Sequence, residues 1–277
     1  MTVSPEEFMA SAPQGLSGSS PWASRYAAEL RRVFHAHAAR APRSLQRHLG
    51  PSELGVECDR QVVAKLCALP VTNHVSDPWP SIVGTACHAW AAEAFEAANR
   101  REGLRWAAEQ RVTPHPDHPG TADLYDAAEQ AVVDHKFLGT ASMAKIRTNP
   151  PRKYVVQLLL YGLGYRNLGL PVRRVVLAAY PRTSASLDGL YVWERPFTDP
   201  DGALTAENAA LLATVFSGTR VRKAAAEALM AGRLRLAEVP STPDPDECIW
   251  CPIFRPQTAR DGGPGCPGTA RSAGTVS

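Results

Sequence analysis

Apolar residues recur along the chain with two different periods, and the change of period separates helical from extended segments. Helical spacing predicts helices at residues 22–49, 52–66, 82–99, 154–169 and 204–237. Partial alternation of apolar and polar residues predicts strands at residues 105–114, 120–126, 130–137, 172–181 and 189–197. The order of helices, three strands, a helix and two strands indicates an α/β core with helical additions at its N-terminal end.

The same pattern divides the chain into five regions. Residues 1–21 are rich in Ser, Pro, Gly and Ala and are expected to form a flexible leader. Residues 22–81 form a helical region, 82–200 the α/β core, 201–240 a helical segment, and 241–277 a cysteine-containing tail. The tail has too few large apolar residues to fold by hydrophobic burial alone, so something else must anchor it.

The composition of the chain says more about the cellular compartment of the protein than about its function. The chain has 277 residues, 44% of them hydrophobic, which is enough for a core without disulfides. Its net charge of +3 is too small to indicate a nucleic-acid partner by itself. It has neither an apolar run long enough to span a membrane nor the order of a signal peptide, so we expect a soluble, cytoplasmic protein with no membrane partner. Its six cysteines are then expected to be thiols or metal ligands.

The most informative segment runs from Gly120 to Lys136, where G-T-A-D is followed after ten residues by D-H-K. If Asp123 and Asp134 lie on adjacent strands, their carboxylates can converge on one point, and hard oxygen ligands of this kind suit Mg²⁺ or Mn²⁺. Lys136 lies two residues after Asp134 and therefore on the same face of the strand. Taken alone, D-x-K is more simply a salt bridge on a strand.

Two further pairs of residues indicate a functional site only in combination with these carboxylates. In G-T-A-C-H, His88 follows Gly84 by four residues on a predicted helix, where a lone histidine is usually structural. Gln157 and Tyr161 stand at i and i+4 on one helix face, where they would otherwise be a surface amide and a packing ring. We expect three other histidine side chains to be exposed, those of His115, His118 and His135.

Cysteines form the second group of candidate ligands. Cys248 and Cys251 form a C-x₂-C pair, and Cys266 follows after fourteen intervening residues. Such a loop lets two thiolates reach one metal centre. Cys67 and Cys87 lie in apolar helical segments and are expected to be buried thiols without a function.

Taken in order, the motifs C-x-R, G-x-x-x-H, G-x-x-D, D-x-K and Q-x-x-x-Y resemble those of the RecB branch of the PD-(D/E)XK nucleases. The resemblance covers residues 52–268. It implies a restriction-endonuclease-like core with a mixed central sheet flanked by helices. It also implies that a metal is held by His88, Asp123, Asp134 and the backbone carbonyl of His135, with Lys136, Gln157 and Tyr161 as further catalytic residues.

The cysteines resemble those of the iron-sulfur members of this branch, the AddB-like nucleases and the CRISPR-associated RecB-family exonucleases. There one cysteine before the core joins three after it around a 4Fe-4S cluster, which here implies Cys58, Cys248, Cys251 and Cys266. Arg60 completes the C-x-R form. The gap between Cys251 and Cys266 is longer than is usual in that family, so a structural Zn²⁺ remains the alternative.

The resemblance implies a metal-dependent DNA exonuclease that acts on single strands or ends, in recombination, repair, phage replication or CRISPR adaptation. Its expected DNA contacts are Gln157, Tyr161, Lys153, Arg152 and Arg60. A helicase, recombinase or CRISPR adaptation partner would be a separate chain, because no phosphate-binding G-x-x-x-x-G-K-[ST] motif is present. The alternative outside catalysis is a vestigial DNA-binding or assembly subunit with a structural iron-sulfur or zinc site.

Overall fold

The computed structural model describes residues 20–40, 49–73 and 77–268 of the chain. The chain divides into two compact units, residues 1–46 and 47–277. In the described part, the first unit consists of helix α2 (Pro21–Ala39), which begins after the cap residue Ser20 and carries Tyr26, Leu30 and Phe34 at four-residue spacing. The predicted leader falls almost wholly outside the described residues, as does most of the predicted helix beyond position 40.

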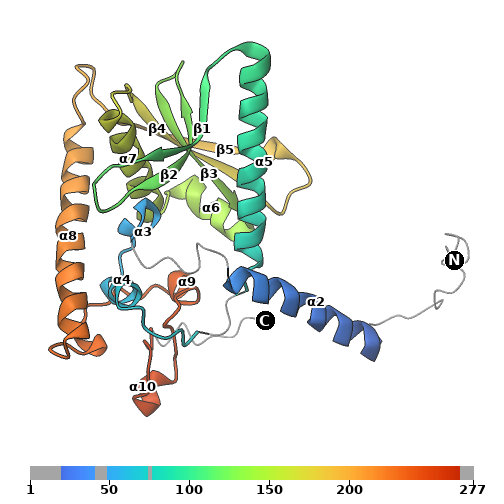
Figure 1. Cartoon of the computed structure of the whole chain (residues 1–277), viewed down its shortest axis with the longest axis vertical. Helices are drawn as coiled ribbons and strands as arrows, with labels where there is room; N and C mark the ends of the chain where they lie inside the picture. The colour runs from blue at the N-terminus through green and yellow to red at the C-terminus, as the bar shows by residue number, and fades with distance from the viewer. Residues whose placement is uncertain (1–19, 41–48, 74–76, 269–277) are drawn as a thin grey trace, which may run out of the picture. The chain divides into compact units, whose positions relative to one another are not determined.

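The second unit contains a five-stranded mixed sheet, as the alternating segments predict (Figure 1). Its strands in spatial order are β1 (Trp106–Val112), β2 (Gly120–Asp126), β3 (Ala131–Leu138), β4 (Arg174–Pro181) and β5 (Tyr191–Pro196). Only β3 and β4 are parallel, and every other neighbouring pair is antiparallel. A parallel pair needs a crossover connection, which here consists of α6 (Thr140–Thr148) and α7 (Arg152–Asn167).

Helices cover both faces of this sheet. On β3, the ring of His135 stacks at 5.6 Å on Phe95 of α5 (Trp79–Glu102). The next side chain, Lys136, lies 5.1 Å from the ring centre of Tyr154 on α7. Because successive strand side chains point to opposite faces, α5 and α7 lie on opposite sides of β3. Helix α8 (Ala206–Met230) packs on α7 as an outer layer (Figure 1).

The prediction of a single helix at residues 52–66 is wrong. The structure has a short α3 (Pro51–Leu54) and a separate α4 (Asp59–Leu66), and Cys58 is the residue that precedes α4. The break lies at Gly55, where an added Cβ would come within 2.6 Å of the Cα of Lys153. Close approach to α7 therefore interrupts the helix and brings Cys58 out of it. Helix α6 was not predicted, and α8 ends at Met230, before the expected position 237.

The cysteine-containing tail packs against α4. Its short helices are α9 (Pro245–Cys248) and α10 (Thr258–Asp261). Ile253 and Phe254 are buried beside Ala64 of α4. The side chain of Asn73 donates to the carbonyls of Ile249 and Cys251 at 2.8 and 3.0 Å. The tail is thus anchored by contacts with an earlier part of the chain. Among the described helices, none has the length and apolar character needed to cross a bilayer.

Candidate functional site

Three acidic residues occupy one row across β1, β2 and β3. The β1–β2 register places Glu109 opposite Asp123, although this single pair is missing from the ladder. The β2–β3 ladder ends at the pair of Leu124 and Val133, and Asp123 and Asp134 are the next residues of the two strands. Facing residues of neighbouring strands have Cβ atoms about 4.5–5.5 Å apart. The sheet therefore brings three carboxylates from separate strands to one region.

Asp123 lies at the centre of this row and contacts α5. Its Oδ2 is 3.5 Å from Nδ1 of His88 and accepts a 2.7 Å hydrogen bond from the backbone N–H of His135. One ligand atom each of His88, Glu109 and Asp123 lies within 4.8 Å of the other two. His88 and Asp123 therefore lie side by side, and Glu109 lies next to them. An imidazole and carboxylates at this spacing can bind a divalent cation.

Asp134 is fully buried, with 0% of its surface exposed. It forms an ion pair with Lys136, and no other donor among the described residues reaches either carboxylate oxygen. Burial raises the pKa of Asp134 to about 6; Lys136 opposes this rise and Asp123 adds to it. A buried carboxylate with so few donors is costly to ionise, and a cation beside it would remove that cost. The donor set and the orphaned oxygens fit a hard divalent metal ion.

Glu109 was missed by the sequence interpretation. It has a left-handed backbone, with φ of 49°, in the middle of β1. This conformation costs a residue other than glycine about 1–3 kcal/mol and tends to occur at functional sites. The only available signal was an acidic residue in the strand next to G-T-A-D. A sequence pattern does not show which residue of β1 faces Asp123.

We expect Glu109→Gly to stabilise the metal-free protein and to weaken metal binding. Glycine relieves the left-handed strain, so the free energy of unfolding should rise by about 1 kcal/mol. Loss of the carboxylate should lower divalent-metal affinity about 10-fold or more. The measurements are denaturant unfolding and metal titration. Gln130→Gly is the matched control, because Gln130 has φ of 51° in the β2–β3 turn, outside the site. If both variants keep wild-type metal affinity, Glu109 is not a ligand.

The prediction that the His135 and His118 side chains are exposed is wrong, since each is only 3% exposed. His135 packs between Phe95 and Tyr180, and its Nδ1 lies 3.2 Å from the hydroxyl of Tyr180. Burial, followed by the positive charges of His88 and Lys136, lowers the pKa of His135 to about 4. The ring fills the space under α5, while its backbone N–H holds Asp123.

Helix α7 carries three polar side chains on one face. Tyr154, Gln157 and Tyr161 follow at spacings of three and four residues, and the Gln157 Nε2 donates to the Tyr161 hydroxyl at 3.2 Å. Gln157 and Tyr161 are 7% and 5% exposed. Burial, with a smaller contribution from Asp134, raises the pKa of Tyr154 to about 12, so this phenol stays neutral beside the site.

The basic residues predicted to contact DNA do not all lie together. Lys145, Arg152 and Lys153 line a cleft of about 620 Å³ between α6, the start of α7 and the tail. Lys153 Nζ contacts both carboxylate oxygens of Glu247 at 2.7 Å, and Lys145 is paired with Asp246. Arg60, by contrast, donates to the carbonyls of Val239 and Ala237. Its guanidinium is bound by the segment just before the tail, so we leave Arg60 out of the proposed DNA surface.

The four predicted cysteine ligands line the same cavity but do not form a compact cluster. Cys58, Cys248, Cys251 and Cys266 line one small cavity between α4 and the tail. Arg60 Nη1 donates to the Cys266 Sγ at 3.4 Å. Among the described residues, no three cysteine sulfurs all lie within 4.8 Å of one another. Burial, and then the neighbouring thiols, raises the pKa of Cys251 to about 11. Thiolates in this cavity therefore need a nearby positive charge.

The remaining cysteines differ from expectation. Cys67 and Cys87 were predicted to be buried, but both are partly exposed. Cys67 lies at the end of α4, where its Sγ is 3.5 Å from the carbonyl of Ala226. Neither lines the cavity of the other four.

No protein-family model matches the sequence, and no curated protein matches it. Among solved structures, the chain is similar to an alkaline exonuclease (LHK-Exo) from Laribacter hongkongensis, with 12% identity over 67% of this chain and 92% of that one, and a TM-score of 0.45. It is also similar to the structure of SSO0001, with 13% identity over 86% of this chain and 94% of that one, and a TM-score of 0.43. A phage-related exonuclease from Haemophilus somnus 129PT has 11% identity over 53% of this chain and 71% of its own, with a TM-score of 0.34. At these scores we rest no functional argument on the similarity.

Proposed function

We propose that this protein is a divalent-metal-dependent deoxyribonuclease that degrades DNA from an end, with single strands as the preferred substrate. One observation carries the proposal. Asp134 is a fully buried carboxylate whose charge is met only by Lys136 among the described residues, in the same row as Asp123 and Glu109. A structural ion pair does not need two further carboxylates and a histidine beside it.

The residues present fit Mg²⁺ or Mn²⁺. Asp123, Asp134 and His88 would hold the ion, together with Glu109 and the backbone carbonyl of His135. When bound, such an ion lowers the pKa of water, polarises the scissile phosphate and stabilises the leaving oxygen. Among the described residues, the sulfur ligands that would favour a softer metal lie in the separate cysteine cavity, not in this group.

The protein's own groups then orient the reactants. The Lys136 ammonium, held between Asp134 and the Tyr154 ring, can position the nucleophile and stabilise negative charge that builds on the phosphate. Gln157 and Tyr161, fixed to each other by their hydrogen bond, would orient the DNA strand. The protein does little covalent chemistry itself, so positioning and charge supply most of the acceleration.

DNA phosphates would bind in the cleft lined by Lys145, Arg152 and Lys153. Both lysines are paired with carboxylates of the tail, and phosphate groups would have to replace those partners. Each lysine that neutralises a phosphate releases a counterion from the DNA and so increases the dependence of binding on salt. The steepness of the salt dependence therefore reports whether the cleft binds DNA.

A cleavage assay tests the proposed exonuclease activity. Purified protein is incubated with end-labelled single-stranded and duplex DNA in Mn²⁺, in Mg²⁺ or in EDTA. We expect products that shorten progressively from an end with metal and none with EDTA. DNA binding without cleavage under any metal condition would favour the alternative, a vestigial DNA-binding or assembly subunit. The sequence contains all the expected catalytic side chains, which argues against that alternative.

We also propose that Cys58, Cys248, Cys251 and Cys266 hold a 4Fe-4S cluster, as in the iron-sulfur RecB-like exonucleases that the motifs resemble. Four thiolates around Zn²⁺ would be about 3.8 Å apart, given Zn–S bonds of about 2.3 Å. Among the described residues, no three cysteine sulfurs lie this close together, so metal analysis has to decide between the cluster and zinc. The centre would link α4 to the tail. A helicase, recombinase or CRISPR adaptation partner would be a separate chain.

We expect Cys251→Ser to release the metal centre and loosen the tail while the sheet stays folded. Cys251 is buried, so loss of its thiolate leaves the cavity without its anchor. The measurements are an absorbance spectrum and metal analysis after anaerobic purification, and limited proteolysis of residues 241–268. Iron with sulfide supports the cluster, and one colourless zinc supports the alternative. Cys87→Ser, outside this cavity, is the control.

A further inference from the structure

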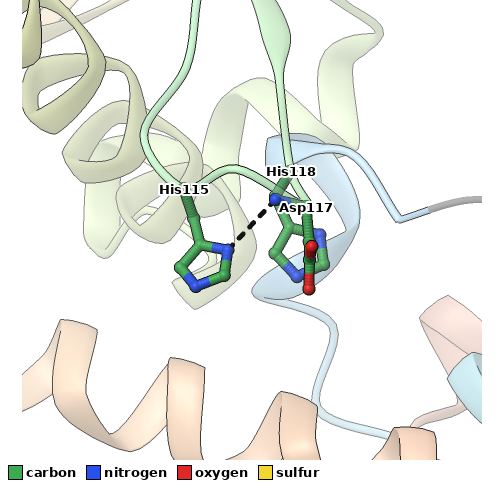
Figure 2. A group of neighbouring side chains, drawn as sticks. All are labelled: His115, Asp117 and His118. Atoms are coloured by element: carbon green, nitrogen blue, oxygen red, sulfur yellow. Dashed lines mark hydrogen bonds between the residues drawn. The ribbon is translucent and has the colours of Figure 1, made fainter.

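The turn between β1 and β2 gathers a second set of metal-ligand side chains that the proposed nuclease site does not use. His115, Asp117 and His118 come from the sequence H-P-D-H, and one ligand atom of each lies within 4.8 Å of the other two (Figure 2). The turn begins where Val112 pairs with Gly120, three residues beyond Glu109. Three strand residues span about 10 Å, so this cluster is separate from the carboxylate row.

His118 is the most constrained of the three. Its side chain is 3% exposed, and Nδ1 lies 2.8 Å from the carbonyl oxygen of Leu49. Because a carbonyl can only accept, Nδ1 carries the proton and donates it. The ring nitrogen Nε2 therefore keeps its lone pair. A metal-binding histidine is commonly oriented in this way, with one nitrogen donating to a carbonyl and the other free to coordinate.

The other two side chains lie toward α8. The ring of His115 is 5.3 Å from that of Phe216, and its Nδ1 accepts a 3.2 Å bond from the backbone N–H of Asp117 (Figure 2). Asp117 Oδ2 accepts a 2.7 Å bond from Lys223. This lysine uses one of the two carboxylate oxygens. The bond to His115 is long, so a cation stronger than a backbone donor can replace it.

We propose that His115, Asp117 and His118 bind one Zn²⁺ ion and thereby fasten the β1–β2 turn. Two imidazoles and one carboxylate suit borderline cations such as Zn²⁺ and are poor ligands for Mg²⁺. Three protein ligands leave a fourth position for water. The ion would hold a turn whose neighbours, Leu49 and α8, come from distant parts of the sequence.

Substituting Lys223 distinguishes zinc binding from a simpler interpretation, an ionic clamp in which the Lys223–Asp117 ion pair alone holds the turn. In the clamp interpretation, the Lys223–Asp117 pair is what holds the turn, and Lys223→Ala weakens the protein without regard to zinc. In the zinc interpretation, Lys223 competes with the ion for Asp117. Lys223→Ala should then tighten zinc binding several-fold and increase the rise in melting temperature that zinc causes.

The experiment uses the full chain with ZnCl₂ at about 10 µM. At this concentration only sites with a dissociation constant of about 10 µM or lower fill substantially. Equilibrium dialysis with metal analysis counts zinc per chain, and anomalous diffraction from zinc-soaked crystals locates it. We expect His115→Ala and Asp117→Asn each to bind one zinc fewer than wild type. Both change ligands outside the core, whereas His118→Ala would also remove a buried ring. His88→Ala is the matched control and should keep the anomalous peak at the turn.

Three results would overturn the proposal. The first is an unchanged zinc count in both His115→Ala and Asp117→Asn. The second is an anomalous map without a peak among the three side chains, and the third is a peak that appears only at millimolar zinc. A peak at the turn in wild type that disappears in His115→Ala, together with tighter binding in Lys223→Ala, supports it.

Discussion

Asp134→Asn is expected to leave a folded protein that no longer cleaves DNA. The substitution keeps the shape of the side chain and removes its charge, so the divalent ion loses its most buried ligand. Stabilisation of the transition state by a metal is worth several kcal/mol. Losing about 4 kcal/mol lowers the rate about 1,000-fold. We therefore expect a loss of Mn²⁺-dependent cleavage of about 1,000-fold or more.

The matched control is Asp126→Asn. Asp126 is also buried and lies on β2, but it accepts hydrogen bonds from Arg105 at 2.8 and 2.6 Å and lies outside the carboxylate row. Its substitution should lower the free energy of unfolding by about 1–3 kcal/mol without abolishing cleavage. Circular dichroism and thermal melts check folding of both variants. Cleavage within about 10-fold of wild type in pure Asp134→Asn protein would refute the proposed metal site.

Lys136→Met should lower the rate of the chemical step while leaving the metal bound. Methionine keeps most of the aliphatic stem that packs under Tyr154 and removes the ammonium. A positioned charge or proton donor typically contributes about 100-fold or more to the rate. Asp134 also loses its internal partner, so its carboxylate should bind the divalent ion at least as tightly as before.

Single-turnover cleavage at saturating DNA and Mn²⁺ measures the rate, and calorimetric titration measures the metal affinity. Lys65→Met is the control, because Lys65 pairs with Glu53 away from the row. A wild-type rate in Lys136→Met would remove Lys136 from the mechanism. Simultaneous loss of metal binding would show instead that Lys136 only maintains the geometry of Asp134.

The candidate site concentrates two features that oppose folding. Asp134 is a buried charge with one ionic partner among the described residues, and Glu109 has a strained backbone in a strand. Both lie in the row that contains Asp123. Functional sites often tolerate such local costs because surrounding packing supports them. Here that packing includes the Phe95 and Tyr180 rings around His135, whose backbone N–H holds Asp123.

The sequence predicted the regular elements of the core well. All five strands and helices α5 and α7 lie close to their predicted positions, because each has a clear apolar period of its own. Helix α6 was missed because it is nine residues long and begins after Gly139, which offers no side-chain cap. The break at Gly55 was missed because its cause is the distant backbone of Lys153.

The amino-acid sequence alone determined the residue types of the site and their order, since D-x-K, G-x-x-D and C-x₂-C are local patterns. The tertiary structure decided which side chains meet. It added Glu109 through the β1–β2 register, buried His135 between α5 and the sheet, and brought Cys58 to the tail cysteines. Period and chemistry are properties of neighbouring residues along the chain. Register and burial depend on segments that become neighbours only when the sheet and its helices assemble.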